Sequence, residues 1–586
     1  MKNILLMCLL STLVSTSSCR KAPVKDNTGI INQENQYPVN INTDKAMYSP
    51  GDNINFSIDK ALPSGTVVTY KYLNSVVAKQ ELNGTSWTWK APSQDFSGYM
   101  VEISREEGGK NKIYGCIGID VSSDAAKFPR NGFLSKYGQM SEVQIHNVMS
   151  NLNRLHINWV QFQDWEFKHH EPLAGTPSDP AESWKDIANR TNYKSTVQGY
   201  IAAAKSYNMK TLSYNAIYGA LDDAASDGVS DQWYMYEDQH HQTRPVLQLP
   251  PPFKSSIYYM DPSNTGWQNY IAGKTKEAFE VYDFDGNQVD QYGNLNKKVY
   301  TYSGVPIDVE TSFKSFLEAM KTNMPDKKLV MNAVNQYGQQ VSISKSPVDF
   351  LYTEVWAPNE GYKDLASIIQ ENDEWSNYSK KSVLCAYMDY NLAANPGYFN
   401  TPGVLLTDAV IFAFGGSHLE MGEHMLGKEY FPNDNLQMHA DLKNDIVSYY
   451  DFLTAYQNLL RDGGNFNNPA ITSADGKIKF NNWPPAIGSV SVIGKDMGQK
   501  QIIHLINFSN ASSLSWRDAD GTQTVPDSLT DFEVKFSTAK VIKKIWIASP
   551  DIDYGSSRGI EFKQSGDAVS FSVPSLLYWD MIVIEY

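Results

Sequence analysis

Two carboxylates stand where predicted strands end, a position from which side chains can do acid–base chemistry. Asp290 closes an apolar run, and Gly293 lets the backbone turn away just beyond it. Glu354 ends a second apolar run and is followed by Val355 and Trp356. Hydrolysis of a glycosidic bond needs such a pair, because one carboxylate attacks or stabilises the anomeric carbon and the other protonates the leaving oxygen. The apolar neighbours of Glu354 would raise the pKa of its carboxyl by desolvation, as the acid of the pair requires.

The segment 124–463 has the alternating pattern of strands and helices that could position these side chains. Apolar residues recur at helical spacing, for example at Phe313, Phe316, Leu317 and Met320. Between the helical stretches lie short apolar runs, at 155–162, 211–217, 284–289, 328–333, 350–355 and 383–388. Repeated strand–helix units predict a mostly parallel sheet, and their number favours a closed (β/α)8 barrel over an open doubly wound sheet. No glycine-rich dinucleotide or phosphate loop follows these runs, which weakens the open-sheet alternative.

Other acidic side chains also follow predicted strands or flank them. In a (β/α)8 barrel the active site lies at the C-terminal ends of the strands, so these positions compete for the same roles. A carboxylate at a strand end is often only a helix N-cap or a hydrogen-bonding group of a loop. The competing residues are Asp164, Asp261, Asp283, Asp285, Asp389 and Glu423. The residues by themselves therefore indicate a barrel enzyme with the groups of a glycosidase, and they do not select one pair.

Two segments with a β pattern flank the predicted barrel. From 40 to 123, short alternating runs broken by proline and glycine turns predict a small β-sandwich. We expect this unit to serve packing or spacing, with glycan binding as the alternative. From 464 to 586 the alternating pattern returns and predicts a second β-sandwich.

The N-terminus has the features of an export signal. Lys2 precedes an apolar run at 4–13, and small residues follow, which predicts a signal peptide over 1–18. Cys19 comes directly after the small residues and resembles the lipid-anchor site of bacterial lipoproteins, although Thr16 replaces the usual leucine. Residues 19–39 would then be a tether, and a plain signal peptide with an incidental cysteine is the alternative. We expect an exported protein, either periplasmic or a lipoprotein of the outer membrane or cell surface.

Composition narrows the classes of function. The 586 residues carry a formal charge of −15, so no excess of lysine and arginine is present to displace the counterions of a nucleic acid. The 13 Trp, 35 Tyr and 24 Phe suit a ligand with apolar faces and hydroxyl edges, such as a sugar, and suit aromatic β-sheet cores equally well. Beyond the N-terminus, no apolar run is long enough for a membrane helix. Cys116 and Cys385 fall in different predicted domains, so no disulfide framework is indicated.

Two short segments carry a resemblance to a known family. The stretch 284–293 and the stretch 352–356 are similar to the catalytic segments of glycoside hydrolase family 66, which contains dextranases and cycloisomaltooligosaccharide glucanotransferases. The family's order of an Ig-like domain, a (β/α)8 barrel and a C-terminal β-sandwich also fits. So do Trp165 after the first predicted barrel strand and the stretch 214–220 after the second. The resemblance implies that Asp290 is the nucleophile and Glu354 the general acid/base of a retaining mechanism.

The same resemblance implies the substrate. The expected reaction is internal cleavage of α-1,6 linkages in dextran to isomalto-oligosaccharides, by a monomer that needs no cofactor. The glucanotransferases of the family carry a carbohydrate-binding insertion within the barrel, and the segment 354–463 has no room for one, which favours hydrolysis over cyclisation. The alternatives are a glucanotransferase, a barrel glycosidase for another α-linkage, and a lipid-anchored glycan-binding protein without catalysis.

Further residues after predicted strands are candidates for sugar contacts. Trp356 is the strongest, because its ring could stack on a glucose face two residues beyond Glu354. The paired His169 and His170 have no third ligand at a recognisable spacing, so we predict no metal site. The predicted substrate-binding residues are Asp164, Trp165, Asn215, Tyr218, Asp261, Trp356, Asp389 and Glu423, with His169, His170, Asn332 and His424 as weaker candidates.

Overall fold

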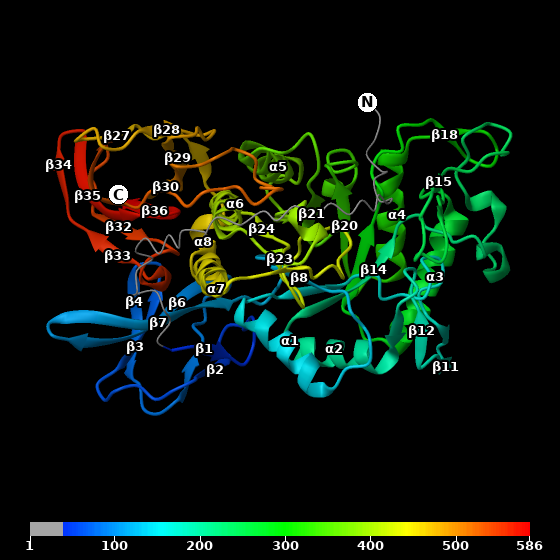
Figure 1. Ribbon diagram of the computed structural model, residues 1–586, viewed down its shortest axis with the longest axis horizontal. Coiled ribbons are helices and arrows are strands. Elements are labelled where there is room, and N and C mark those ends of the chain that lie inside the picture. Colours follow the sequence, from blue (N-terminus) through cyan, green and yellow to red (C-terminus); the bar gives the residue numbers. More distant parts are fainter. Residues whose placement is uncertain (1–38) are drawn as a thin grey trace, which may run out of the picture.

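The computed structural model describes residues 39–586, so the predicted signal peptide, Cys19 and nearly all of the predicted tether lie outside the described residues. At the centre, eight parallel strands form one sheet in the order β8, β9, β14, β17, β20, β21, β22 and β24. The sheet is nearly closed into a barrel, because Phe133 N of β8 donates a hydrogen bond to Met421 O (3.1 Å), three residues beyond the end of β24. The predicted fold class, a (β/α)8 barrel flanked by β-sheet units, is confirmed (Figure 1). The strands are Asn131–Leu134 (β8), Trp159–Phe162 (β9), Lys210–Ala216 (β14), Gly286–Asp290 (β17), Lys328–Val334 (β20), Leu351–Glu354 (β21), Ser382–Cys385 (β22) and Ser417–His418 (β24).

Helices connect these strands and cover the barrel. They are Glu142–Arg154 (α1), Lys194–Ser206 (α2), Thr265–Val281 (α3), Val309–Asn323 (α4), Tyr362–Trp375 (α5), Thr401–Ala413 (α6) and Ala440–Ala455 (α7). Between β20 and β21 the short 3-10 turn Ile343–Lys345 takes the place of a helix. α4 buries the predicted stripe of Phe313, Phe316, Leu317 and Met320 against the barrel. Over residues 39–586, the helices are all too short or too polar to cross a bilayer.

Two barrel strands were not predicted from the sequence. β24 spans two residues, and β8 is short and contains Asn131 and Gly132, so neither forms an apolar run that stands out. The predicted first barrel strand is therefore the second, β9. Tyr214 and Asn215, which we expected just after a strand, lie within β14 near its C-terminal end.

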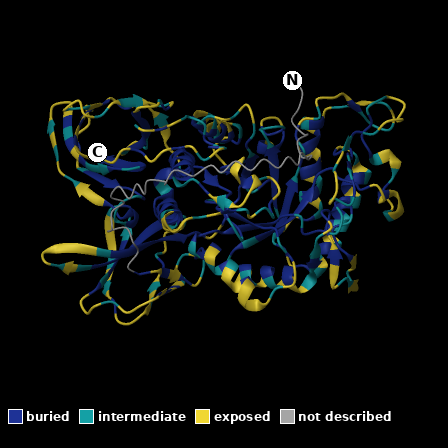
Figure 2. Cartoon of the chain, viewed as in Figure 1, coloured by how far each residue is buried: buried dark blue, intermediate teal, exposed yellow. Residues whose placement is uncertain are grey.

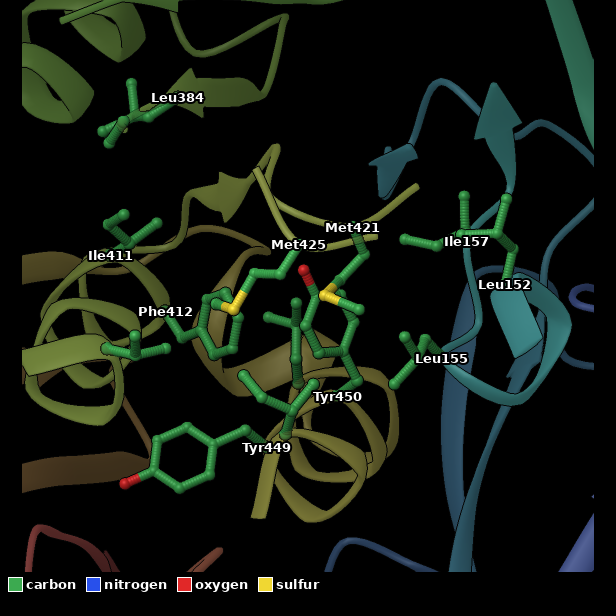
Figure 3. Packing of buried hydrophobic residues seen from close by; sticks show 14 of the residues in the cluster. Leu152, Leu155, Ile157, Leu384, Ile411, Phe412, Met421, Met425, Tyr449 and Tyr450 are labelled. Atoms are coloured by element: carbon green, nitrogen blue, oxygen red, sulfur yellow. The ribbon is translucent and has the colours of Figure 1, made fainter. Parts of the chain in front are cut away.

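The strands and helices pack through a continuous apolar layer. Leu384 of β22, Ile411 and Phe412 of α6, and Tyr450 of α7 are fully buried in one cluster (Figure 3). α6 is apolar on all sides and buried along nearly its whole length, because it lies between the barrel strands and neighbouring helices and also touches the C-terminal sheets. Exposed residues are concentrated in loops and on the outer faces of elements such as α1 (Figure 2).

The N-terminal unit consists of two antiparallel sheets. Burial alternates along β2, so that Ile54, Phe56 and Ile58 face the core, as a period of two requires. Phe56 stacks on Trp87 with 4.9 Å between ring centroids. One sheet contains Ile41–Thr43 (β1), Asn53–Ile58 (β2) and Ser86–Lys90 (β5), and the other Ser75–Glu81 (β4), Val67–Tyr72 (β3), Ser97–Glu107 (β6) and Lys110–Val121 (β7).

The C-terminal unit also contains two sheets, which pack through the buried cluster around Leu505, Phe532 and Val573. One sheet consists of Asn465–Asn467 (β26), Ser489–Asp496 (β29), Lys500–Phe508 (β30), Trp579–Glu585 (β36), Lys544–Ala548 (β32) and Arg558–Ile560 (β33), with Phe480–Asn482 (β28) beside β29. The other consists of Ile471–Ser473 (β27), Leu529–Ser537 (β31), Ala568–Leu576 (β35) and Phe562–Ser565 (β34). Between β30 and β31 the chain leaves the sheets as the 509–528 loop, which runs toward the barrel (Figure 1).

The N-terminal unit packs against α7 at close range. A Cβ on Gly118 of β7 would lie 2.5 Å from Asp451 O, and one on Gly98 of β6 would lie 2.2 Å from Thr454 O. Only glycine permits this approach of backbone to backbone. The Asp451 carboxylate then accepts hydrogen bonds from Gly118 N (2.9 Å) and Arg154 Nη1 (2.9 Å).

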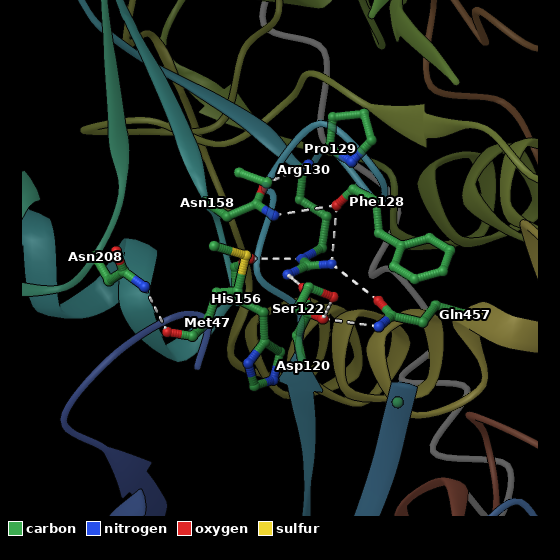
Figure 4. Close-up of polar contacts among 12 residues, drawn as sticks. Met47, Asp120, Ser122, Phe128, Pro129, Arg130, His156, Asn158, Asn208 and Gln457 are labelled. Atoms are coloured by element: carbon green, nitrogen blue, oxygen red, sulfur yellow. Dashed lines mark hydrogen bonds and ion pairs between the residues drawn. The ribbon is translucent and has the colours of Figure 1, made fainter. Parts of the chain in front are cut away.

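A buried ion pair joins the same unit to the barrel. Arg130 Nη2 lies 2.7 Å from Asp120 Oδ2, and neither side chain is exposed. Arg130 Nε donates to His156 O, and Asp120 Oδ1 accepts from Gln457 Nε2 (2.8 Å) of the short helix Gln457–Leu460 (α8). One network thus fixes β7, the entry to β8 and α8 relative to one another (Figure 4).

Candidate active site

The two predicted catalytic carboxylates meet at one end of the barrel. Asp290 ends β17 and Glu354 ends β21, and β20 lies between these strands in the sheet. Asn332 of β20 donates from Nδ2 to Asp290 Oδ1 (2.8 Å) and to Glu354 Oε2 (3.0 Å). Both acidic residues are half-buried, so neither is sealed beneath packed side chains. The structure therefore brings together the two side chains to which the family resemblance assigned the catalytic roles.

The spacing of the pair has a chemical meaning. Because both carboxylates contact one nitrogen, their nearest oxygens lie within about 6 Å of each other. Retaining glycosidases hold their carboxyl groups about 5–5.5 Å apart, whereas inverting enzymes leave about 6.5–9.5 Å to admit a water molecule. The observed contact fits direct attack on the sugar by one of the carboxylates.

Each carboxylate is also held by a tyrosine hydroxyl. Tyr214 donates to Asp290 Oδ2 (2.6 Å), while Gln291 N donates to Asp290 Oδ1 (2.8 Å). Tyr387, just beyond β22, donates to Glu354 Oε1 (2.7 Å). These bonds fix the orientation of both side chains before any substrate binds.

The environment of the two acids shifts the pKa of each carboxyl group. Burial, and then the charge of Asp290, raise the pKa of Glu354 to about 7, against the opposing hydrogen bonds from Tyr387 and Asn332. Burial also raises the pKa of Asp290, while the hydrogen bonds from Tyr214 and Asn332 and from Gln291 N lower it. Near neutral pH the pair can therefore hold one proton on Glu354 and one charge on Asp290, as a nucleophile and an acid require.

A second group of titratable side chains lies beside Asp290, in the loop after β9. Tyr292 Oη lies 3.4 Å from His169 Nε2, and His169 Nδ1 lies 2.8 Å from Glu166 Oε1. Although burial opposes it, the contact with Glu166 raises the pKa of His169, and the histidine charge in turn lowers the pKa of Asp290. Asp164 is half-buried in the same loop, and burial together with the charge of Glu166 raises its pKa to about 7.

Trp356 lies two residues beyond Glu354, among aromatic side chains of the site. Its half-buried ring lies 5.3 Å from the ring of Tyr387 and 5.8 Å from that of Tyr390. The guanidinium of Arg517, from the 509–528 loop, lies 5.0 Å from the centre of the Trp356 ring. The predicted aromatic candidate thus stands at the site, and a residue of the C-terminal unit stands beside it.

Four other predicted contact residues have structural roles here. Trp165 is fully buried, its ring packs edge-on against Tyr282, and its indole N donates to Ser213 Oγ, so it offers no face to a ligand. The others are Asn215, whose amide donates to a backbone carbonyl, Tyr218, which is buried among other tyrosines, and Asp261, which caps the turn leading to α3.

The remaining predicted acids lie in different places. Glu423 accepts hydrogen bonds from Ser135 N (2.8 Å) and Lys136 N (2.9 Å), which ties the loop after β24 to that after β8. Asp389 is fully buried beside the 509–528 loop, and burial raises its pKa to about 8. Asp285 accepts from Thr211 N at the start of β14, which places it at the end of the barrel opposite to Asp290. Asp283, its near neighbour in the sequence, pairs with Lys205.

Among the described residues, two groups of side chains have the types and proximity of metal ligands. His170, Asp223 and Asp227 form one, but the Lys168 ammonium lies 2.8 Å from Asp223 and 2.6 Å from Asp227. The other consists of the buried Asp408, His418 and Glu420. In it, both ring nitrogens of His418 have partners: Nδ1 faces Asp408 Oδ1 (2.8 Å) and Nε2 faces Ala386 O (2.8 Å). Although burial opposes it, the charges of Glu420 and Asp408 raise the pKa of His418. The protonated imidazole can therefore itself be the cation between these two carboxylates.

Three side chains of the site had no assigned role in the sequence analysis. Tyr387 and Arg517 are not next to a predicted catalytic segment in the chain, and Tyr214 was noted only within a similar stretch. A tyrosine just after an apolar run is common in buried cores, so residue type alone gives no sign of a hydrogen bond to a distant glutamate.

The comparisons with known proteins agree with this geometry. The model of glycosyl hydrolase family 66 matches residues 43–583. A cycloisomaltooligosaccharide glucanotransferase of Niallia circulans is 27% identical over 709 aligned residues, covering 93% of this chain and 71% of that protein. A dextranase of Streptococcus salivarius is 25% identical over 572 residues, covering 83% of this chain and 67% of that protein.

A solved structure shares the fold. The crystal structure of a cycloisomaltooligosaccharide glucanotransferase of Paenibacillus sp. complexed with cycloisomaltoheptaose matches with a TM-score of 0.85 and 24% identity. The match covers 93% of this chain and 99% of that chain. The likeness therefore includes the flanking β-sheet units as well as the barrel.

Proposed function

The chain belongs to glycosyl hydrolase family 66, and on that basis we propose that it hydrolyses α-1,6 linkages within dextran to give isomalto-oligosaccharides. The observation that carries the proposal is the contact of Asp290 and Glu354 with the same Asn332 nitrogen, which keeps their nearest oxygens within about 6 Å and supports a retaining mechanism. The names of the relatives, a dextranase and glucanotransferases that form cyclic isomalto-oligosaccharides, support the substrate class.

In the first step, Asp290 attacks the anomeric carbon and forms a β-glucosyl ester. Glu354 donates its proton to the departing glycosidic oxygen, which leaves as a neutral hydroxyl group. The raised pKa of Glu354, about 7, leaves a large fraction of this carboxyl protonated near neutral pH. The hydrogen bonds from Tyr214 and Asn332 stabilise Asp290 as the anion it must be before attack.

In the second step, water replaces the first product. Glu354, now a carboxylate, removes a proton from this water as its oxygen attacks the anomeric carbon. The bond to Asp290 breaks, and the sugar leaves with its original α configuration. The Tyr387 hydroxyl stabilises the Glu354 anion that exists between the two steps.

Cyclisation is the second candidate function, because two relatives are named as cycloisomaltooligosaccharide glucanotransferases. The segment from β21 to the end of α7 supports hydrolysis instead, since α5, β22, α6 and β24 fill it without an inserted domain. The alignment with the Niallia circulans protein spans 709 positions, more than the 586 residues of this chain, so that relative contains segments lacking here.

One experiment separates these functions. The purified chain is incubated with dextran, pullulan, starch and galactan, and the products are sized and tested for reducing ends. We expect reducing isomalto-oligosaccharides from dextran alone. Cyclic products without reducing ends would favour the glucanotransferase, and binding of dextran without any product would favour a non-catalytic glycan-binding protein.

We also propose that the protein is exported and anchored through Cys19, from the apolar run at 4–13 and the small residues after it. In a Cys19→Ala variant expressed with the full leader, the protein should move from the membrane fraction to the soluble one. An unchanged distribution would leave the plain signal peptide as the better account.

A further inference from the structure

The 509–528 loop of the C-terminal unit is docked on the catalytic end of the barrel. Trp516 in this loop is fully buried, and its indole N donates to Asn359 O (2.8 Å). Its backbone N donates to Glu360 O (3.1 Å), and its carbonyl accepts from Thr407 Oγ1 (3.0 Å) of α6. The loop therefore has a fixed position relative to the strand ends that carry the site.

Arg517 follows this anchor and reaches two of those strand ends. Its Nη2 donates to Val355 O (2.8 Å), and its Nη1 donates to Tyr387 O (3.1 Å). Val355 is the residue after Glu354, and Tyr387 is the residue whose hydroxyl donates to Glu354. One guanidinium thus links the carbonyl of the residue after the proposed acid/base to the carbonyl of its hydrogen-bond donor, Tyr387.

Further contacts hold the arginine in this place. Its guanidinium lies 5.0 Å from the ring centre of Trp356 and 5.5 Å from that of Tyr390. Its carbonyl accepts a hydrogen bond from Asp389 N (2.9 Å). Arg517 is half-buried under these rings, and its planar group is suited to bridging two fixed carbonyls.

We propose that Arg517 is a positioning residue for the general acid/base, supplied to the barrel by the C-terminal unit. This inference rests on the proposed function, because it takes Glu354 as the group that protonates the leaving oxygen. Arg517 touches no reacting atom; it sets the distance and angle between Glu354 and Tyr387. A displacement of about 1 Å at such a group can cost about a hundredfold in rate.

The loss of rate caused by a displaced Glu354 depends on the leaving group of the substrate. A sugar hydroxyl is a poor leaving group and needs the proton from Glu354, whereas a nitrophenolate departs without one. Damage to the position of the acid should therefore slow cleavage of dextran and spare a nitrophenyl α-isomaltoside. General damage to the fold or to the nucleophile would slow both substrates alike.

The test compares Arg517→Gln and Arg517→Lys with Asp520→Asn in the full chain. Asp520 lies on the same loop and accepts from Asn391 Nδ2 (2.9 Å), away from Val355 and Tyr387, so its variant is the matched control. For Arg517→Gln we expect kcat/KM on dextran to fall about tenfold or more and that on the nitrophenyl substrate less than about threefold. Arg517→Lys, which cannot bridge both carbonyls, should show the same selective loss to a smaller degree and serves if the glutamine variant does not fold.

Equal losses on both substrates in a folded arginine variant, or no loss on either, would overturn the inference. So would a selective loss in Asp520→Asn as large as that in Arg517→Gln. Failure of the unaltered chain to cleave either substrate would instead contradict the proposed function itself, and with it the role assigned to Glu354.

Discussion

Asp290 and Glu354 accept hydrogen bonds from the same side-chain nitrogen, at 2.8 Å and 3.0 Å, although they end different strands. The donor, Asn332, is neutral, so it adds no charge of its own between the two acids. Burial, and then the charge of Asp290 at short range, raise the pKa of Glu354, which favours a state with the proton on Glu354 and the charge on Asp290. The close approach of the two carboxylates thus determines the geometry of the pair and also contributes to its ionisation.

Removal of the Tyr387 hydroxyl should move the basic limb of the pH profile. That hydroxyl lowers the pKa of Glu354, so in Tyr387→Phe the pKa should rise above its present value of about 7. Because Glu354 must be protonated to act as the acid, kcat/KM should persist to higher pH, by about one pH unit. The measurement is the pH dependence of kcat/KM on dextran; a shift of the basic limb to lower pH would contradict the assignment.

Removal of the Tyr214 hydroxyl should affect the acid limb of the pH profile of kcat/KM. Tyr214 stabilises the anion of Asp290, so Tyr214→Phe should raise the pKa of this nucleophile further. Because Asp290 must be ionised to attack, the acid limb of kcat/KM should move to higher pH while the basic limb changes little. A profile in which the basic limb alone moves would show that the two tyrosines do not act on separate acids.

Glu354 should reduce stability at high pH. The folded protein raises the pKa of Glu354 from 4.5 to about 7, so the stability that its neutral form contributes is present below 4.5 and is lost as the pH rises through about 7. Glu354→Gln stays neutral, so the Tm of the variant minus that of the unaltered protein should grow between about pH 5 and about pH 8. Glu371→Gln, at an exposed position of α5, is the control and should show no such trend. A difference that stays constant or shrinks with pH would contradict the raised pKa.

The ion pair between Asp120 and Arg130 should matter for stability and not for chemistry. Both side chains are fully buried, so Asp120→Asn leaves an uncompensated charge and should cost about 3–5 kcal/mol. The half-buried, solvent-accessible pair of Asp462 with Lys127 offers the control, since Asp462→Asn should cost about 1 kcal/mol or less. Thermal unfolding gives the stabilities, and kcat on dextran well below the unfolding temperature should be unchanged in both variants. A loss of kcat in Asp120→Asn would show that the network also supports the site.

Much of this architecture could be predicted from local sequence. Six apolar runs predicted six of the barrel strands, because strands buried on both faces are apolar throughout. Asp290 and Glu354 became candidates by the same route, since each ends such a run, and the resemblance to the family selected them from the competing acids. The two-residue β24 and the short β8 were missed, because hydrogen bonds to neighbouring strands define them more than their own residues do.

The environment of the carboxylates could not be predicted in this way. Arg517 reaches the carbonyl of Val355, the residue after Glu354, from the C-terminal unit, and no local pattern signals that approach. Trp165 illustrates the opposite error: a tryptophan after a strand suits a sugar platform, but this ring is fully buried in the core. Residue type indicates candidates, and tertiary packing decides which of them lie beside Asp290 and Glu354.

The most direct test of the account is to identify the residue that carries the covalent intermediate. The protein is incubated with a 5-fluoro α-isomaltosyl fluoride, which slows release of the bound sugar, and is then digested and analysed by peptide mass spectrometry. The account predicts one added sugar on Asp290, no label in Asp290→Asn, and α-configured products from dextran by NMR. A label on Asp164 or Glu354, or β-configured products with no label, would contradict it.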